Sequence, residues 1–128
     1  MTQEDKDLLL KDLCARIPYK IKCEVYNRVG ILIEVNEYGF AVTYDGGLEE
    51  TTCQINNIKP YLFPMSSMTE EQKIIYGDFV YEIVSSNLLE TQKCISNLHD
   101  WLNKNHFDYR GLIPMGLGID ATGLNIYV

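Results

Sequence analysis

The chain has 128 residues, the size of one domain, and its 46% apolar and 23% charged residues are close to the globular average, which excludes disorder throughout. Eighteen Asp and Glu against eleven Lys and Arg give a net charge of −7, which argues against a general binder of nucleic acid or anionic membranes. No apolar run approaches the roughly 18 residues that cross a bilayer, and the acidic start is unlike a secretory signal. We therefore expect a cytoplasmic protein.

The N-terminal stretch is predicted to form a helix over residues 3–16. Thr2 and Asp5 resemble a capping box with Asp in place of Glu, and acidic residues suit the first turn of a helix. Pro18 ends the helical pattern. The apolar residues that share one face, and should pack on the core, are Leu9, Leu10, Leu13, Cys14 and Ile17.

The pattern then changes to the alternation that is typical of half-buried strands. The predicted strands cover residues 20–25, 31–35, 40–44 and 51–55. Turns rich in Asn, Asp and Gly separate the first three strands and end the third. These elements predict an α+β protein with an antiparallel meander of four to five strands, of the kind that closes into a small SH3-like or Sm-like barrel.

Residues 59–68 contain two prolines and several large apolar side chains, unlike a flexible linker. We expect a fixed strap that joins residues 1–58 to a helical part, 69–128, within a single domain. Adjacent side chains of an extended chain point to opposite sides, so at least one aromatic should stay partly exposed. A rigid exposed aromatic is a good contact surface, and the candidate partner-binding residues are Tyr61, Phe63, Met65 and Met68. The alternative is that the segment only covers the core.

Two helices are predicted after the strap. Thr69 and Gln72 form a capping box at the start of the first, near residue 70, although residues 79–84 also favour a strand. Its expected buried residues are Ile75, Tyr76, Phe79, Val80 and Ile83. The second helix covers about residues 90–105, with an apolar face of Cys94, Ile95, Leu98, Trp101 and Leu102. A short helical turn after Asp108 and an extended tail ending in residues 126–128 complete the prediction.

The four cysteines lie nine, thirty and forty-one residues apart, without a Cys-x-x-Cys pair. Each is in an apolar pattern, so we expect buried free thiols, and a disulfide or a metal site is the alternative. The two histidines, His99 and His106, are seven residues apart, whereas metal-binding pairs on a helix more often use three or four. We expect both at the edge of the apolar face of the second helix.

No catalytic, cofactor or metal site is predicted, and we do not expect an enzyme. Residues 116–121 match the Gly-x-Gly-x-x-Ala dinucleotide fingerprint, but only seven residues follow, too few for the helix that would hold a pyrophosphate. The acidic pairs at residues 49–50 and 70–71 suit a solvated turn and a helix start, so they do not require paired catalytic carboxylates.

Three segments have a specific resemblance: LLLKDLCARIPY at residues 8–19, IKPYLFPMSSMTEEQ at 58–72 and DWLNKNHFDYRGLI at 100–113. They resemble, in this order and over about 40 residues, a family of small hypothetical proteins of gut anaerobic bacteria and their phages. The resemblance implies a phage, prophage or mobile-element accessory protein inside a bacterial cell. It implies no activity and no site residues.

The composition and the resemblance together predict a non-enzymatic accessory protein that binds another protein. Nine tyrosines suit an interaction surface, because the ring is apolar and the hydroxyl polar. The alternative is an acidic mimic that occupies the nucleic-acid groove of a host factor, for which the carboxylates should lie in a row. Direct nucleic-acid binding and an enzyme rank third and fourth. The partner and the oligomeric state are left open, and no nucleic acid, membrane, cofactor or metal is expected.

Overall fold

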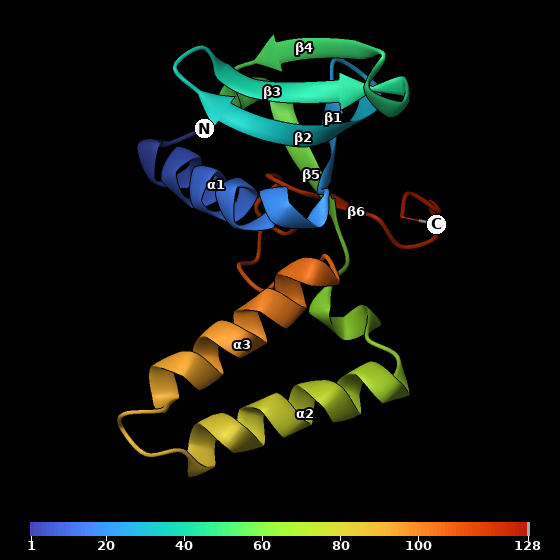
Figure 1. Ribbon diagram of the computed structural model, residues 1–128. Helices are drawn as coiled ribbons and strands as arrows, with labels where there is room; N and C mark the ends of the chain where they lie inside the picture. Colours follow the sequence, from blue (N-terminus) through green and yellow to red (C-terminus); the bar gives the residue numbers. More distant parts are fainter. Residues whose placement is uncertain (128) are drawn as a thin grey trace.

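The computed structural model describes residues 1–127, apart from the side chain of Asp45, and is built from a sheet with one helix against it and a helical hairpin that projects from the sheet (Figure 1). Helix α1 (Gln3–Arg16) lies beside the sheet, and helices α2 (Glu70–Ser85) and α3 (Thr91–Lys104) form the hairpin. The mixed α and β composition agrees with the prediction. Val128, the last residue of the predicted tail, lies outside the described residues.

Helix α1 has the predicted bounds because its start and end are encoded locally. The Thr2 hydroxyl accepts a hydrogen bond from the Asp5 amide (3.1 Å), and the Thr2 amide donates to the Asp5 carboxylate (3.2 Å). A 3-10 turn, Ile17–Tyr19, with Pro18 at its start follows the helix. The buried face differs in part, since Leu10 and Cys14 are exposed, whereas Asp12 and Arg16 are buried with Leu9 and Leu13.

Within the described part of the chain, the sheet has six strands in the order β4-β3-β2-β1-β5-β6. Strands β1 to β5 pair with antiparallel neighbours, and β6 runs parallel to β5. The bounds are β1 Lys22–Val25, β2 Arg28–Asn36, β3 Gly39–Tyr44, β4 Glu49–Cys53, β5 Ile58–Leu62 and β6 Ile119–Asp120.

The predicted number of four to five strands was wrong, because the sheet of the described residues has six. The barrel into which such a meander can close is not formed, since the sheet is open. The 3-10 turn Ile55–Asn57 takes the chain from β4 to the opposite edge of the meander, where Pro60 in β5 is opposite Cys23 in β1. The C-terminal segment then adds β6 to the outer edge of β5. Long-range pairing of this kind leaves no local pattern in the sequence.

The segment predicted as a strap is a strand in its first half. Residues 59–62 belong to β5, and a 3-10 turn, Met65–Ser67, leads to α2. Helix α2 includes residues 79–84, so the alternative of a strand there was wrong. Asp108 begins hydrogen-bonded turns rather than a helical turn, because its carboxylate accepts from the amides of Leu112 (2.8 Å) and Ile113 (2.9 Å).

The apolar core of the described chain has two parts. The larger one lies between α1 and the sheet and includes Leu112 and Leu117 from the C-terminal segment. The smaller one joins the hairpin to the turn before α2, and its buried members are Met68, Leu98, Leu102 and Phe107. The hairpin is therefore attached to the body mainly through its α3 end.

Candidate functional site

The residues predicted to bind a partner lie mostly inside the molecule. Tyr61 is 7% exposed and Met68 is 8% exposed, and Phe63 and Met65 are half-buried. The Phe63 ring packs against those of Phe107 (centroids 6.5 Å apart) and Tyr127 (5.9 Å). These side chains do not together form an exposed apolar patch.

Large exposed apolar side chains instead gather on α2 and on the turn that follows it. None of the residues of α2 is buried, although the side facing α3 packs Tyr76, Phe79 and Ile83 against the smaller core. The exposed apolar residues of this region are Ile74, Ile75, Tyr81, Val84, Leu88 and Leu89. Exposed Ile75 contradicts the prediction that it belongs to the buried face.

The outer residues of α2 follow heptad spacing. Ile74, Gly77, Tyr81 and Val84 are separated by three, four and three residues, and Leu88 is four residues further on. Residues at this spacing lie along one side of a helix. We call Ile74, Tyr81 and Val84 the outer stripe, and Leu88 lies beyond the end of α2, in the turn that follows. The sequence contains this pattern, but α2 has a second apolar side, with Tyr76, Phe79 and Ile83, and the sequence analysis assigned only that side.

The turn between α2 and α3 exposes two leucine side chains to solvent. Leu88 is 97% exposed and Leu89 is 94% exposed. The Asn87 side chain accepts hydrogen bonds from the amides of Leu89 (3.0 Å) and Glu90 (3.0 Å), and the Asn87 carbonyl accepts from the Thr91 amide (3.1 Å). The hydrogen bonds of the turn thus hold its conformation, and packing of Leu88 and Leu89 is not needed for it.

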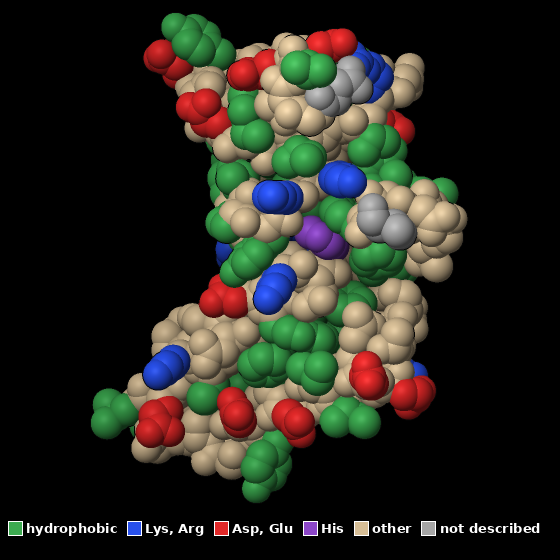
Figure 2. Space-filling model, turned by 45° about the vertical axis from the view of Figure 1, so that its right-hand side comes forward, with side chains coloured by type: hydrophobic (Ala, Val, Ile, Leu, Met, Phe, Trp, Pro, Cys, Tyr) green, Lys and Arg blue, Asp and Glu red, His purple; other side chains and the backbone are tan. Residues whose placement is uncertain are grey.

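Acidic side chains lie beside the outer stripe. Glu71, Asp78 and Glu82 are all exposed, and their spacing of seven and four residues places them along one side of α2. Figure 2 shows carboxylates spaced along the lowest part of the molecule, where α2 lies in Figure 1. Lys73 pairs with Glu70 (3.2 Å), so the surface of α2 has a net negative charge.

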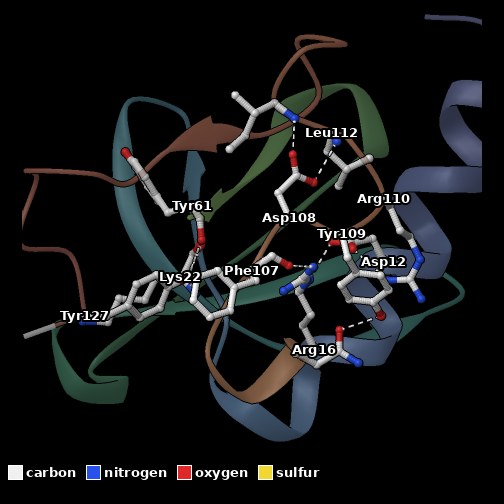
Figure 3. A network of polar contacts seen from close by, with 12 residues as sticks. Asp12, Arg16, Lys22, Tyr61, Phe107, Asp108, Tyr109, Arg110, Leu112 and Tyr127 are labelled. Atoms are coloured by element: carbon white, nitrogen blue, oxygen red, sulfur yellow. Dashed lines mark hydrogen bonds and ion pairs between the residues drawn. The ribbon is translucent and has the colours of Figure 1, made fainter. Parts of the chain in front are cut away.

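A buried ionic network ties α1 to the segment after α3 (Figure 3). Arg16 Nε donates to one oxygen of Asp12 (2.9 Å), and Arg110 Nη1 donates to the other (2.8 Å). Arg16 Nη2 donates to the Phe107 carbonyl (2.7 Å). Asp12 and Arg16 are fully buried, and the network fixes how the hairpin is attached.

The Tyr127 hydroxyl links the C-terminal segment to β1 and β5. It donates to the Tyr61 carbonyl (2.7 Å) and accepts from the Lys22 amide (3.0 Å) (Figure 3). Burial raises the pKa of Tyr127, so the hydroxyl keeps its proton and stays a donor at neutral pH. These bonds hold the C-terminal segment against the sheet.

His106 is not on α3, contrary to the prediction, because the helix ends at Lys104. It adopts a left-handed backbone conformation (φ 61°) and stacks on the Tyr127 ring, with centroids 3.7 Å apart. Burial, together with the charges of Arg16 and Lys22, lowers the pKa of His106 to about 4, so the ring is neutral at pH 7. His99 is exposed on α3 and stacks on Tyr109 (5.1 Å).

The cysteines are all free, and only two of them are buried as expected. Cys23 and Cys53 are buried in the core, where desolvation raises the pKa of each thiol. Cys14 is exposed and Cys94 is half-buried. Among the side chains that the structure describes, no group of three or more His, Cys, Asp or Glu is placed to hold a metal ion.

No helix in the described part of the chain is long and apolar enough to cross a membrane. The chain matches no model of a protein family, no curated protein and no solved structure.

Proposed function

We propose that the protein is a protein-interaction module whose contact surface is the outer stripe of α2 with the leucines of the turn that follows. The observation that supports this proposal is the exposure of six large apolar side chains between residues 74 and 89. A monomeric protein rarely exposes such side chains together, and when it does they usually mark a binding surface. The ordered turn also lowers the entropy cost of using Leu88 and Leu89 in a contact.

The charges on α2 favour a partner with a basic rim around an apolar groove. An amphipathic helix commonly binds by placing its apolar face into a groove. Glu71, Asp78 and Glu82 would then lie at the edge of the contact, where opposite charges speed association and select the partner. A second copy of the chain would bring the same acidic residues together, and like charges oppose such pairing.

We propose a bacterial cytoplasm as the setting, on the resemblance of three segments to small proteins of gut anaerobes and their phages. There the protein would act as a phage or mobile-element accessory protein that binds a host protein. No enzymatic activity is part of this proposal.

The experiment compares two matched double variants. Tyr81→Ala with Leu88→Ser changes the proposed surface, and Tyr38→Ala with Leu48→Ser is the control. Tyr38 and Tyr81 are each 72% exposed, and Leu48 is 88% exposed, so neither pair should alter folding by more than about 0.5 kcal/mol per residue. The partner is captured from the bacterial host with the unaltered chain, purified, and its Kd measured for all three proteins.

We expect the surface variant to raise the Kd at least about tenfold, equivalent to about 1.4 kcal/mol, while the control leaves it unchanged. Hydrogen exchange of the complex should show protection of residues 74–89. Equal affinity of all three proteins, or protection confined to the sheet, would contradict the proposal. If light scattering shows a dimer that the surface variant no longer forms, the surface binds a second copy of the chain and not a host protein.

The second candidate function is the acidic mimic, which the line of carboxylates on α2 favours. Asp78 and Glu82 are about 6 Å apart along the helix axis, and Glu71 is about 10 Å from Asp78. The triple variant Glu71→Gln, Asp78→Asn, Glu82→Gln separates the two functions. A mimic should lose its partner in this variant and keep it in Tyr81→Ala with Leu88→Ser, and it should compete with DNA for the partner. An interaction module should instead lose its partner in Tyr81→Ala with Leu88→Ser and keep it in the triple variant.

A further inference from the structure

A cavity of about 530 Å³ lies on another part of the molecule, between the start of α2, the end of α3 and the C-terminal segment. Its walls include Thr69, which caps α2, Gln72 of the first turn of α2, Lys104 of α3, and His106 and Tyr127. The volume is in the range that small-molecule sites occupy, and the cavity lies between separate elements, where such sites are common. The cavity does not overlap the outer stripe of α2.

The charge of the cavity differs from that of the chain as a whole. None of the described residues that line it is Asp or Glu, although the chain has eighteen, and Lys104 is the charged residue among them. Lys22 lies close by, since its ammonium group donates to the carbonyl of Ile126 (2.7 Å), another lining residue. Figure 2 shows the hollow surface between the sheet and the hairpin, where Lys and Arg side chains gather around a histidine. An anion would be attracted here.

His106 contributes a hydrogen-bonding atom to the cavity. Its Nδ1 atom is buried and has no hydrogen bond with any described residue, and the ring lines the cavity. Nδ1 is enclosed and does not face the cavity, so the nitrogen that an anion there can reach is Nε2, which donates one hydrogen bond when it carries the proton.

One wall of the cavity is aromatic. Phe63, Phe107, His106 and Tyr127 all line it, and their rings contact one another at centroid distances of 3.7 to 6.5 Å. Aromatic walls favour flat apolar groups, which pack offset or edge-on against them. A ligand with a ring and an anionic group would therefore use both features of the cavity.

We propose that this cavity binds a small aromatic anion, with its ring against Phe63 and Tyr127 and its anionic group between Lys104 and His106. The ammonium group of Lys104 supplies the charge, and the Nε2–H of His106 supplies the direction. The anionic group is a phosphate or a carboxylate, because both offer oxygen acceptors to these donors.

The two histidines make the test direct, because each gives its own imidazole signal in NMR and His99 is outside the cavity. The chain is titrated with phenyl phosphate, benzoate, inorganic phosphate and phenol. We expect phenyl phosphate or benzoate to shift the His106 signal saturably, with a Kd below about 1 mM, and to leave His99 unchanged. Bound anion should also raise the pKa of His106, since an opposite charge favours the protonated ring.

Lys104→Gln should weaken binding by about tenfold or more, and Lys93→Gln is the matched control. Both lysines are exposed on α3, and Lys93 does not line the cavity, so both variants should fold. If phenyl phosphate binds more strongly than benzoate, the natural ligand carries a phosphate. If benzoate binds more strongly, the natural ligand carries a carboxylate. The proposal is overturned if no probe shifts His106, if phenol or inorganic phosphate binds as tightly as the aromatic anions, or if the two lysine variants behave alike.

Discussion

The carboxylate of Asp12 pairs with two arginines inside the molecule. Replacing Asp12 therefore measures how much this network contributes to the stability of the fold. Arg16 is fully buried and Arg110 is 13% exposed, and each donates to a different oxygen of Asp12. A buried ion pair contributes little compared with an apolar replacement of the whole pair, because both charges lose hydration. Removal of one partner is different, since it leaves a buried charge without compensation.

We predict that Asp12→Ala lowers the free energy of unfolding by about 3–5 kcal/mol, because Arg16 keeps its charge and loses its carboxylate. Urea denaturation measures the loss. Asp7→Ala is the control, since Asp7 is exposed on the same helix and should change stability by less than about 0.5 kcal/mol. A loss below about 1 kcal/mol for Asp12→Ala would show that Arg16 finds another partner or reaches water.

His106 should make stability depend on pH between 6.5 and 4. Its pKa is about 4 in the folded protein and 6.5 when unperturbed. As the pH falls through this interval, the unfolded chain binds a proton that the folded chain does not, so the free energy of unfolding decreases. The stability that the neutral ring contributes is therefore present at pH 7 and lost toward pH 4.

We predict that His106→Asn removes this pH dependence, since Asn is neutral and tolerates the left-handed backbone. Urea denaturation at pH 7 and pH 5 should show that the unaltered chain loses about 1 kcal/mol more than the variant, after allowance for solvent screening. His99→Asn should behave like the unaltered chain. If His106→Asn retains the full pH dependence, other groups are responsible for it.

At the scale of elements, two glycines show opposite environments. A Cβ atom at Gly30 in β2 would meet the side chain of Val42 and lie 2.9 Å from the Thr43 carbonyl oxygen, so neighbouring strands require glycine there. A Cβ atom at Gly77 in α2 would meet nothing within 4 Å. The same substitution should therefore have opposite effects in the two elements.

We predict that Gly30→Ala destabilises the protein by about 1–3 kcal/mol through overpacking, while Gly77→Ala stabilises it by about 0.5–1 kcal/mol through helix propensity. Thermal and urea denaturation measure both. Each variant serves as a control for the other, because the chemical change is identical. A loss of stability in Gly77→Ala would show that α2 is more closely packed than its exposure indicates.

At the scale of the whole molecule, the two parts of the core differ in size. Among the described residues, the core between α1 and the sheet contains fourteen buried apolar residues, and the core of the hairpin contains four. Regions with few buried apolar contacts open with lower free energies than the rest of a protein. The hairpin should therefore be the less stable part.

We predict that native-state hydrogen exchange gives lower opening free energies for the amides of α2 than for those of β1, β2 and β3. The helix amides should exchange as a group through local opening, whereas the strand amides should require global unfolding. Binding of a partner to the outer stripe should slow exchange in α2. Identical opening free energies for α2 and β2 would show that the molecule unfolds as one unit.

The elements with local signals were predictable from the sequence. The capping boxes at Thr2 and Thr69 determine where α1 and α2 begin, because the cap bonds join residues three positions apart. Alternating side chains and turn residues likewise predicted β1 to β4, with boundaries displaced by up to three residues. The candidate surface was less predictable, because α2 has apolar residues on two sides and the sequence alone did not show which side meets α3.

The sequence by itself determined the helices, the meander and the acidic character of the protein, because short-range bonds and composition are enough for these properties. Only the tertiary structure decided that β5 pairs with β1, that the sheet stays open, that Tyr61 and Met68 are buried, and that the outer stripe of α2 is exposed. It also brought His106, Lys104 and Tyr127 to one cavity. These features depend on contacts between residues distant in the chain, and the burial of each side chain is decided by what the rest of the fold places against it.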